Sequence, residues 1–312
     1  MTDDPEIDAP EIDGPAIDGP EIDGPAIDGA VLDAHVHVWE LSRRALAWLP
    51  SGHPLRRDFT LEGFTTDVVL VQADADPAEV WDLLALGQQD QRVVGVVGWF
   101  DLLDVPDRWP DDQLLVGVRS PPHDQTDPES MTAPAHLRGV RAAAEAGLAI
   151  DLLLRPSALI GAARLANAVP GARLVLDHLG NPDPSSAAAN DDWLTGMRAL
   201  AECPNVSVKL SGTAHLATDA LRALVDVALE LFGSQRLLFG SDWPVCTPAR
   251  SRAEVLRRTT ALLPPATHND VLRGTAQRIY RPRETAPCPN TPDARSSGPQ
   301  APQPAPQRSP AP

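Results

Sequence analysis

The sequence predicts an α/β fold, a TIM (β/α)8 barrel with disordered N- and C-terminal tails. Eight short segments rich in Val, Leu and Ile recur along the chain, and most are near-continuous apolar runs, as expected of parallel strands covered on both faces. Helical patterns lie between most of these segments. No Gly-x-Gly-x-x-Gly follows the first segment, which disfavours the doubly wound sheet that usually binds nucleotides.

The expected strands are dominated by branched aliphatic residues and are short. They are Val31–Val38, Val68–Gln72, Val93–Phe100, Leu115–Arg119, Leu148–Leu154, Arg173–His178, Val206–Leu210 and Leu237–Gly240.

The expected helices are marked by residues that favour helix ends. The first has Asp76 as its N-cap, Pro77 at the first helical position and Glu79 able to close a capping box, and runs to about Gln91. A second helix is expected over 134–146 and ends at Gly147, and a third over 219–232 is capped by Thr218 and ends at Gly233. A fourth begins at Ser251, with Glu254 three residues later. A fifth runs from Thr267 to about Tyr280.

Composition divides the chain into three parts. Residues 1–29 repeat a five-residue unit and hold ten acidic and no basic residues, so a disordered acidic tail is expected. Residues 283–312 are Pro-rich and are expected to be a second disordered tail. The 30–282 segment has ordinary globular composition and the usual size of one barrel domain.

Charge and cysteine content limit the partners. The formal net charge is −17, of which the ten acidic residues of the N-terminal tail supply most. Clustered Lys and Arg, which nucleic-acid binding requires, are lacking, and no apolar run reaches the roughly 20 residues of a membrane span. Three widely spaced cysteines and the absence of a signal peptide favour the cytoplasm. A small-molecule substrate is the expected partner, and a homo-oligomer is left open.

Polar residues at the ends of the expected strands predict an active site, because barrel enzymes carry theirs at the C-terminal ends of the strands. His35 and His37 alternate on the first strand and so share a face. His178 ends the sixth strand and Asp242 ends the eighth. Each has an ordinary structural explanation by itself, but together they converge on one point. Asp177 is expected to point away from His178 and to be structural.

The segments around these residues resemble the amidohydrolase superfamily. Asp33–Trp39, Lys209–Gly212 and Phe239–Val245 are the most specific of them, with Lys-Leu-Ser-Gly and Phe-Gly-Ser-Asp-Trp-Pro following His-x-His in order. Within the superfamily they are most similar to the sugar-lactonase branch, with its fuconolactonase-like and pyrone-dicarboxylate-lactonase-like members. The resemblance extends over about 32–280.

This resemblance implies a hydrolase that opens a small lactone, in particular a sugar-derived aldonolactone. It implies that Asp242 is the general base that activates water and later protonates the leaving alkoxide. His35, His37 and His178 would hold one divalent ion with Asp242, or would polarise the substrate carbonyl directly. Zinc is the favoured metal, and metal-independent chemistry is also compatible. Leu154-Arg155-Pro156 supplies no bridging ligand for a second metal.

Four further residues are candidates for substrate binding. The resemblance implies that Arg119 and Lys209 contact the oxygens of the lactone or of its acid product. Arg155 is a candidate second cation, and Trp39 offers a stacking surface for a sugar ring, with rim packing as its alternative. Lys209 is the only lysine among 26 basic residues, which suggests that a compact ammonium is required there, although chance survival is the alternative.

Two other functions remain open at this point. One is a metal-dependent decarboxylase of an aromatic or muconate-type acid, and the other is an inactive barrel used as a binding scaffold. Gly-Val-Arg at 117–119 favours the lactonase. The retention of all four candidate catalytic residues argues against the scaffold.

Overall fold

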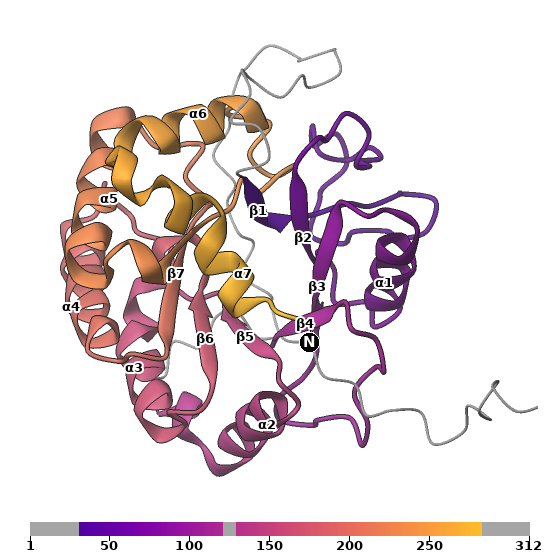
Figure 1. Cartoon of the computed structure of the whole chain (residues 1–312), viewed down its shortest axis with the longest axis horizontal. Coiled ribbons are helices and arrows are strands. Elements are labelled where there is room, and N and C mark those ends of the chain that lie inside the picture. The colour runs from indigo at the N-terminus through magenta and orange to yellow at the C-terminus, as the bar shows by residue number, and fades with distance from the viewer. Residues whose placement is uncertain (1–30, 121–128, 283–312) are drawn as a thin grey trace, which may run out of the picture.

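A computed structural model describes residues 31–120 and 129–282 (Figure 1). These residues form one eight-stranded parallel sheet in the order β1 to β8, which confirms the predicted barrel. The strands are β1 Leu32–Val36, β2 Asp67–Val71, β3 Val93–Trp99, β4 Leu115–Arg119, β5 Ala149–Leu152, β6 Arg173–Leu176, β7 Val206–Leu210 and β8 Leu237–Phe239.

The barrel closes between β1 and the residues that follow β8. The His37 N–H donates to the Trp243 carbonyl at 2.7 Å, and the Asp242 N–H donates to the His35 carbonyl at 2.9 Å. The segment after β1 and the segment after β8 are thus joined at the residues where the active site was predicted.

Helices cover the outside of the barrel in Figure 1. They are α1 Glu79–Gln89, α2 Pro134–Glu145, α3 Leu159–Ala168, α4 Ala187–Ala201, α5 Thr218–Phe232 and α6 Arg252–Leu262, whereas α7 Thr275–Ile279 lies across one end of the barrel. In the described residues, loops rather than α-helices connect β1 to β2 and β3 to β4. Gly147 and Gly233 follow α2 and α5 with φ of +75° and +65°, as a helix-ending glycine does.

The capping box predicted for α1 was wrong. The helix begins at Glu79, and the Glu79 carboxylate accepts the N–H groups of Ala73 and Asp74 instead of that of Asp76. Asp76 accepts the Ala78 N–H within the turn before the helix. Glu79 is buried and therefore fixes the loop after β2. At α6 the Ser251 side chain does accept the Glu254 N–H, as its spacing predicted.

The apolar core has two layers. A large outer layer fills the space between strands and helices, and a smaller inner layer fills the barrel. Ala276, Ile279 and Tyr280, from α7 and the residue after it, pack with the inner layer, and α7 (yellow) crosses the ring of strands in Figure 1. The last described helix thus closes one end of the barrel, and the predicted active site lies at the other end.

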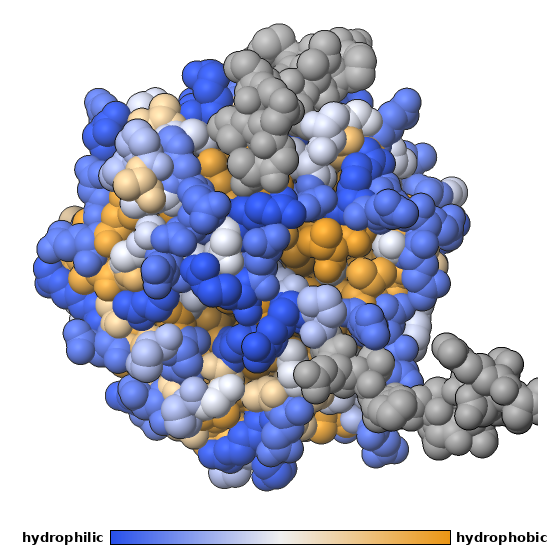
Figure 2. Space-filling model, viewed as in Figure 1, coloured by the Kyte–Doolittle hydropathy of each residue, from blue (hydrophilic) through white to orange (hydrophobic). Residues whose placement is uncertain are grey.

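The outer surface is mostly hydrophilic on the face that Figure 2 shows, with an apolar area between β2 and α1. None of the helices in the described ranges combines the length and the apolar character needed to cross a membrane. The predictions for residues 1–29 and 283–312 lie outside the described residues.

Candidate active site

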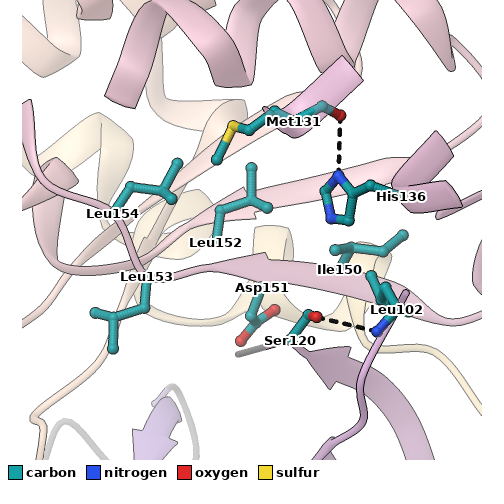
Figure 3. A pocket seen from close by; sticks show the side chains of 9 residues that line it. All are labelled: Leu102, Ser120, Met131, His136, Ile150, Asp151, Leu152, Leu153 and Leu154. Carbon is teal, nitrogen blue, oxygen red and sulfur yellow. Dashed lines mark hydrogen bonds between the residues drawn. The ribbon is translucent and has the colours of Figure 1, made fainter. Parts of the chain in front are cut away.

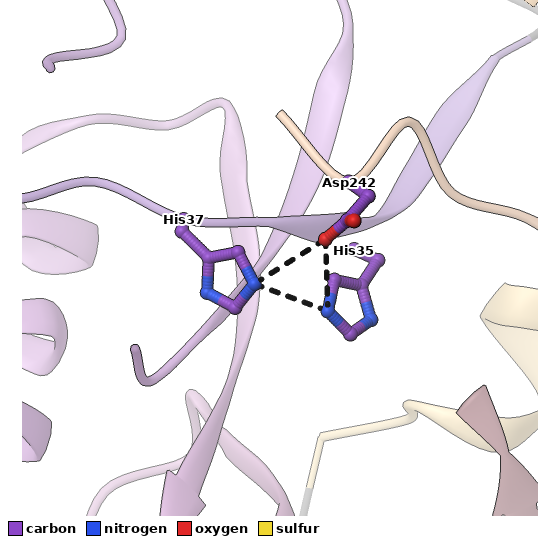
Figure 4. Close-up of side chains that lie close together, drawn as sticks. All are labelled: His35, His37 and Asp242. Atoms are coloured by element: carbon purple, nitrogen blue, oxygen red, sulfur yellow. Dashed lines mark hydrogen bonds and ion pairs between the residues drawn. The ribbon is translucent and has the colours of Figure 1, made fainter. Parts of the chain in front are cut away.

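Three of the predicted catalytic side chains meet at the C-terminal end of the barrel (Figure 4). The Nε2 atoms of His35 and His37 lie 3.2 Å apart. Oδ1 of Asp242 lies 3.7 Å from His35 Nε2 and 3.6 Å from His37 Nε2. All three residues are buried. Side chains 207 residues apart in the sequence therefore face one small volume.

His37 is oriented by the backbone of the neighbouring strand. Its Nδ1 lies 2.6 Å from the carbonyl oxygen of Val71, the last residue of β2. A carbonyl oxygen can only accept, so His37 carries a proton on Nδ1 and turns Nε2 toward His35 and Asp242.

Asp242 is held in an uncommon backbone conformation. Its φ is +60°, a region that non-glycine residues rarely occupy and that marks strain at functional sites. The preceding residue is fixed by Asp33 on β1, whose Oδ1 accepts the Ser241 N–H at 2.8 Å. Oδ2 of Asp33 accepts from Nε of Arg252, the first residue of α6, at 3.0 Å, and both side chains are buried. This ion pair ties the segment that carries Asp242 to the strand that carries the two histidines.

His178 reaches the same volume from the turn after β6. Its ring centroid lies 4.6 Å from that of His35, and its Nδ1 lies 2.9 Å from Ser211 Oγ. Gly212 packs against the ring so closely that a Cβ there would come within 2.7 Å of it. His178 itself has φ of +54°.

Asp177 and His178 do not point in opposite directions, so that prediction was wrong. β6 ends at Leu176, and the left-handed conformation of His178 breaks the strand alternation on which the prediction depended. Oδ1 of Asp177 lies 3.4 Å from His35 Nδ1, on the side of the ring away from Asp242. Asp177 is thus a direct neighbour of the predicted site.

Lys209 lies beneath the site and has no exposed surface. Its Nζ is 2.5 Å from Asp151 Oδ2, 3.1 Å from His35 Nδ1 and 3.0 Å from Asp177 Oδ1. The Tyr280 hydroxyl donates to the other Asp151 oxygen at 2.7 Å. The structure therefore surrounds the ammonium with protein groups, which does not favour the predicted direct contact with substrate.

Burial and these neighbours shift several pKa values. Burial raises the pKa of Asp242, but the imidazoles of His178, His37 and His35 outweigh it and hold the pKa at about 2. Burial, with Lys209 nearby, lowers the pKa of His35 well below its ordinary value, and burial lowers that of His178. Near neutral pH the site thus contains an ionised carboxylate beside two neutral imidazoles.

The other predicted substrate-binding residues differ in burial: Arg119 and Trp39 are buried, and Arg155 is exposed. Arg119 is buried at the end of β4, where it donates to the Gln72 carbonyl at 2.6 Å and lies over the Trp99 ring. Its Nε has no hydrogen-bond partner among the described residues. Arg155 is exposed in the turn after β5. Trp39 is buried, its indole N–H donates to the Arg57 carbonyl, and its ring packs edge-on against Trp48 and Phe59. Packing therefore accounts for Trp39 without a stacked sugar.

A small cavity lies beside β5 (Figure 3). Asp151, Ser120 and His136 line it among apolar side chains, and its volume is about 20 Å³, room for about one water molecule. It is too small for a sugar.

The residues of Figure 4 fit one divalent ion. The ligand atoms of His35, His37 and Asp242 lie within 4.8 Å of one another. Tetrahedral zinc with bonds of about 2.0–2.2 Å spaces its ligands roughly 3.3–3.6 Å apart, close to the separations here. Such an ion would use Nε2 of both histidines and Oδ1 of Asp242. His178 lies beside this group rather than within it.

Several residues at the site escaped sequence reasoning. Asp151 and Tyr280 gave no local signal, because a lone Asp within an apolar strand and a Tyr at a helix end are both commonplace. Ser211 and Gly212 stood inside the Lys-Leu-Ser-Gly string, but nothing in the string showed that they contact His178. Asp33 was noted only as part of the His-x-His segment.

Comparison with known proteins places these residues in context. A family model described as amidohydrolase matches residues 32–281. An L-fucono-1,5-lactonase of Burkholderia multivorans is 32% identical over 293 residues, which cover 81% of this chain and 96% of that protein. The crystal structure of a Burkholderia multivorans amidohydrolase with bound Zn superimposes with a TM-score of 0.73 at 29% identity, over 81% of this chain and 99% of that one. A 5-carboxyvanillate decarboxylase of Sphingomonas paucimobilis shares the fold alone, at 14% identity and a TM-score of 0.57, over 82% of this chain and all of that one.

Proposed function

The chain belongs to the amidohydrolase family, and on this premise we propose that it hydrolyses a small lactone, with sugar-derived aldonolactones as the substrate class. The observation that carries the proposal is the meeting of the ionised Asp242 carboxylate with the imidazoles of His35 and His37. The similarity to an L-fucono-1,5-lactonase over most of both chains supports the choice of a cyclic ester as substrate.

Asp242 serves as the base in the first half of the reaction. Its carboxylate orients a water molecule and takes one of its protons while the water oxygen attacks the lactone carbonyl carbon. The tetrahedral intermediate then collapses, the bond between the carbonyl carbon and the ring oxygen breaks, and the ring oxygen leaves as an alkoxide. Asp242 then returns that proton to the alkoxide, which yields the hydroxy acid.

The negative charge that develops on the carbonyl oxygen needs hydrogen-bond donors held in place. His35 and His178 present their rings to the same volume as Asp242, and both are fixed on their far side, by Lys209 and by Ser211. Arg119 at the end of β4 supplies a positive charge, and its Nε makes no hydrogen bond to any residue that the structure describes. These groups would stabilise the oxyanion and hold the hydroxyls of the substrate.

A divalent ion held by His35, His37 and Asp242 would add Lewis-acid polarisation of the carbonyl when bound. The zinc in the Burkholderia multivorans amidohydrolase structure supports zinc as its identity.

The two alternatives have weaker support. Similarity to the decarboxylase is limited to the fold. An inactive scaffold would have no need of a strained, buried carboxylate aimed at two imidazoles.

A panel of aldonolactones in weakly buffered pH indicator tests the proposal. Lactone opening releases acid, whereas decarboxylation consumes a proton, so the direction of the colour change separates the two reactions. We expect acidification with at least one aldonolactone and no release of CO2 from aromatic acids. Alkalinisation with an aromatic acid, or a panel without turnover, would refute the lactonase.

A further inference from the structure

The only lysine and the only tyrosine of the 312-residue chain meet at one buried carboxylate. Lys209 binds one oxygen of Asp151 and Tyr280 binds the other, and Lys209 Nζ lies 5.3 Å from the centroid of the Tyr280 ring. None of the three side chains is more than 3% exposed. β5, β7 and the end of α7 thus place this cluster directly beneath His35.

The contact between Lys209 and His35 determines which ring nitrogen of His35 carries no proton. An ammonium has only donors, so the 3.1 Å contact of Nζ with His35 Nδ1 requires a lone pair on Nδ1. A neutral imidazole with a bare Nδ1 carries its proton on Nε2. Two carboxylates pair with this ammonium, since Nζ lies 2.5 Å from Asp151 Oδ2 and 3.0 Å from Asp177 Oδ1.

The contact between the two histidines agrees with this assignment. His37 donates from Nδ1 to the Val71 carbonyl, which leaves its Nε2 bare. The two Nε2 atoms are 3.2 Å apart, so without an ion between them one can donate a hydrogen bond to the other. His35 must therefore be the donor.

A second arrangement of His35 is also within reach. Oδ1 of Asp177 lies 3.4 Å from the same Nδ1 and can accept a hydrogen bond from it as well as from Lys209. With its proton on Nδ1, His35 would donate to Asp177 and present a bare Nε2. Only this arrangement can ligate a metal through Nε2.

We propose that Lys209 selects the tautomer of His35: its ammonium keeps the proton on Nε2, which makes His35 a hydrogen-bond donor to the site and weakens zinc binding there. Lys209 is thus a positioning residue. If the proposed lactonase function holds, His35 Nε2–H is the group that donates to the carbonyl oxygen of the lactone.

Two measurements that need no substrate test the inference, so their outcome is independent of the proposed function. Spectra of protein labelled with 15N-histidine report which ring nitrogen is protonated, and His35→Gln identifies the His35 signals. Wild-type His35 should be protonated on Nε2, and Lys209→Met should move the proton to Nδ1. Zinc affinity, measured by competition with a chromophoric chelator, should rise roughly 10- to 100-fold in Lys209→Met, the same size as the loss that removal of a supporting neighbour of a metal ligand causes.

Lys209→Met leaves two buried carboxylates without their cation, so the variant Lys209→Met/Asp151→Asn removes one of these charges as well and should show the same two changes. Tyr280→Phe is the matched control, because it alters the Asp151 contact but retains the ammonium; its tautomer and zinc affinity should stay those of the wild type. A wild-type His35 protonated on Nδ1 would overturn the inference even if no variant folds. An unchanged tautomer or unchanged zinc affinity in the lysine variants would also overturn it.

Discussion

Replacing Asp242 by Asn preserves the shape of the side chain and removes both its charge and its ability to accept a proton. Loss of a general base costs about 10²- to 10⁴-fold in rate, or about 3–5 kcal/mol in the barrier, and we expect kcat/KM for lactone opening to fall by that amount. The pH-indicator assay measures it. Asp192→Asn, on the exposed surface of α4, is the matched control and should leave kcat/KM unchanged.

The same substitution should also change how the free energy of unfolding depends on pH. Burial opposes the charge of Asp242, but the three imidazoles lower its pKa from 3.8 to about 2. Because the folded-state pKa is depressed, the ionised carboxylate stabilises the fold above pH 4, and this contribution disappears as the pH falls toward 2. Urea unfolding of the wild type should therefore show the free energy of unfolding falling between pH 4 and pH 2, and Asp242→Asn should lack this part of the pH dependence. A kcat/KM within about tenfold of the wild type would refute the assignment of the base.

Three other predictions follow from the surroundings of the site. Arg252→Met leaves the buried Asp33 carboxylate without its cationic partner, so the free energy of unfolding in urea titrations should fall by about 3–5 kcal/mol. A loss below about 1 kcal/mol would mean that this ion pair does not stabilise the closure of the barrel. Gly212→Ala places a Cβ within 2.7 Å of the His178 ring at a φ of +66°, so kcat should fall at least tenfold in the lactone assay, whereas full activity would show that the ring position is unimportant. Burial lowers the pKa values of His35 and His178, and the neutral imidazoles are the active form, so kcat/KM should stay constant as the pH falls to 6.5 and decline only below it; an acid limb above pH 6.5 would contradict this.

The barrel and its catalytic end were predictable because they depend on local patterns. Apolar runs fix the strands to within a few residues, and parallel strands in a barrel bring their C-terminal ends together wherever they lie in the sequence. His35, His37 and Asp242 were found on this basis, since each is a polar residue at the end of an apolar strand.

The residues beneath the site could not be predicted, because their roles depend on contacts between distant strands. Asp151 becomes informative only when β5 lies near enough to β7 for its carboxylate to meet Lys209. The direction of Asp177 depended on where β6 ends and on a left-handed turn at His178, which an apolar pattern does not encode. The scarcity of lysine did mark Lys209 as unusual, but the sequence suggested a substrate contact where the structure shows a buried ammonium.

Hydrolysis in water enriched in 18O tests most directly whether the site directs water to the carbonyl carbon. In a single turnover, mass spectrometry of the product should find one 18O atom in the carboxylate of the hydroxy acid, and Asp242→Asn should abolish this incorporation on the same timescale. Finding the label in the released hydroxyl group instead, or equal incorporation by the variant, would contradict attack on the carbonyl by a water that Asp242 activates.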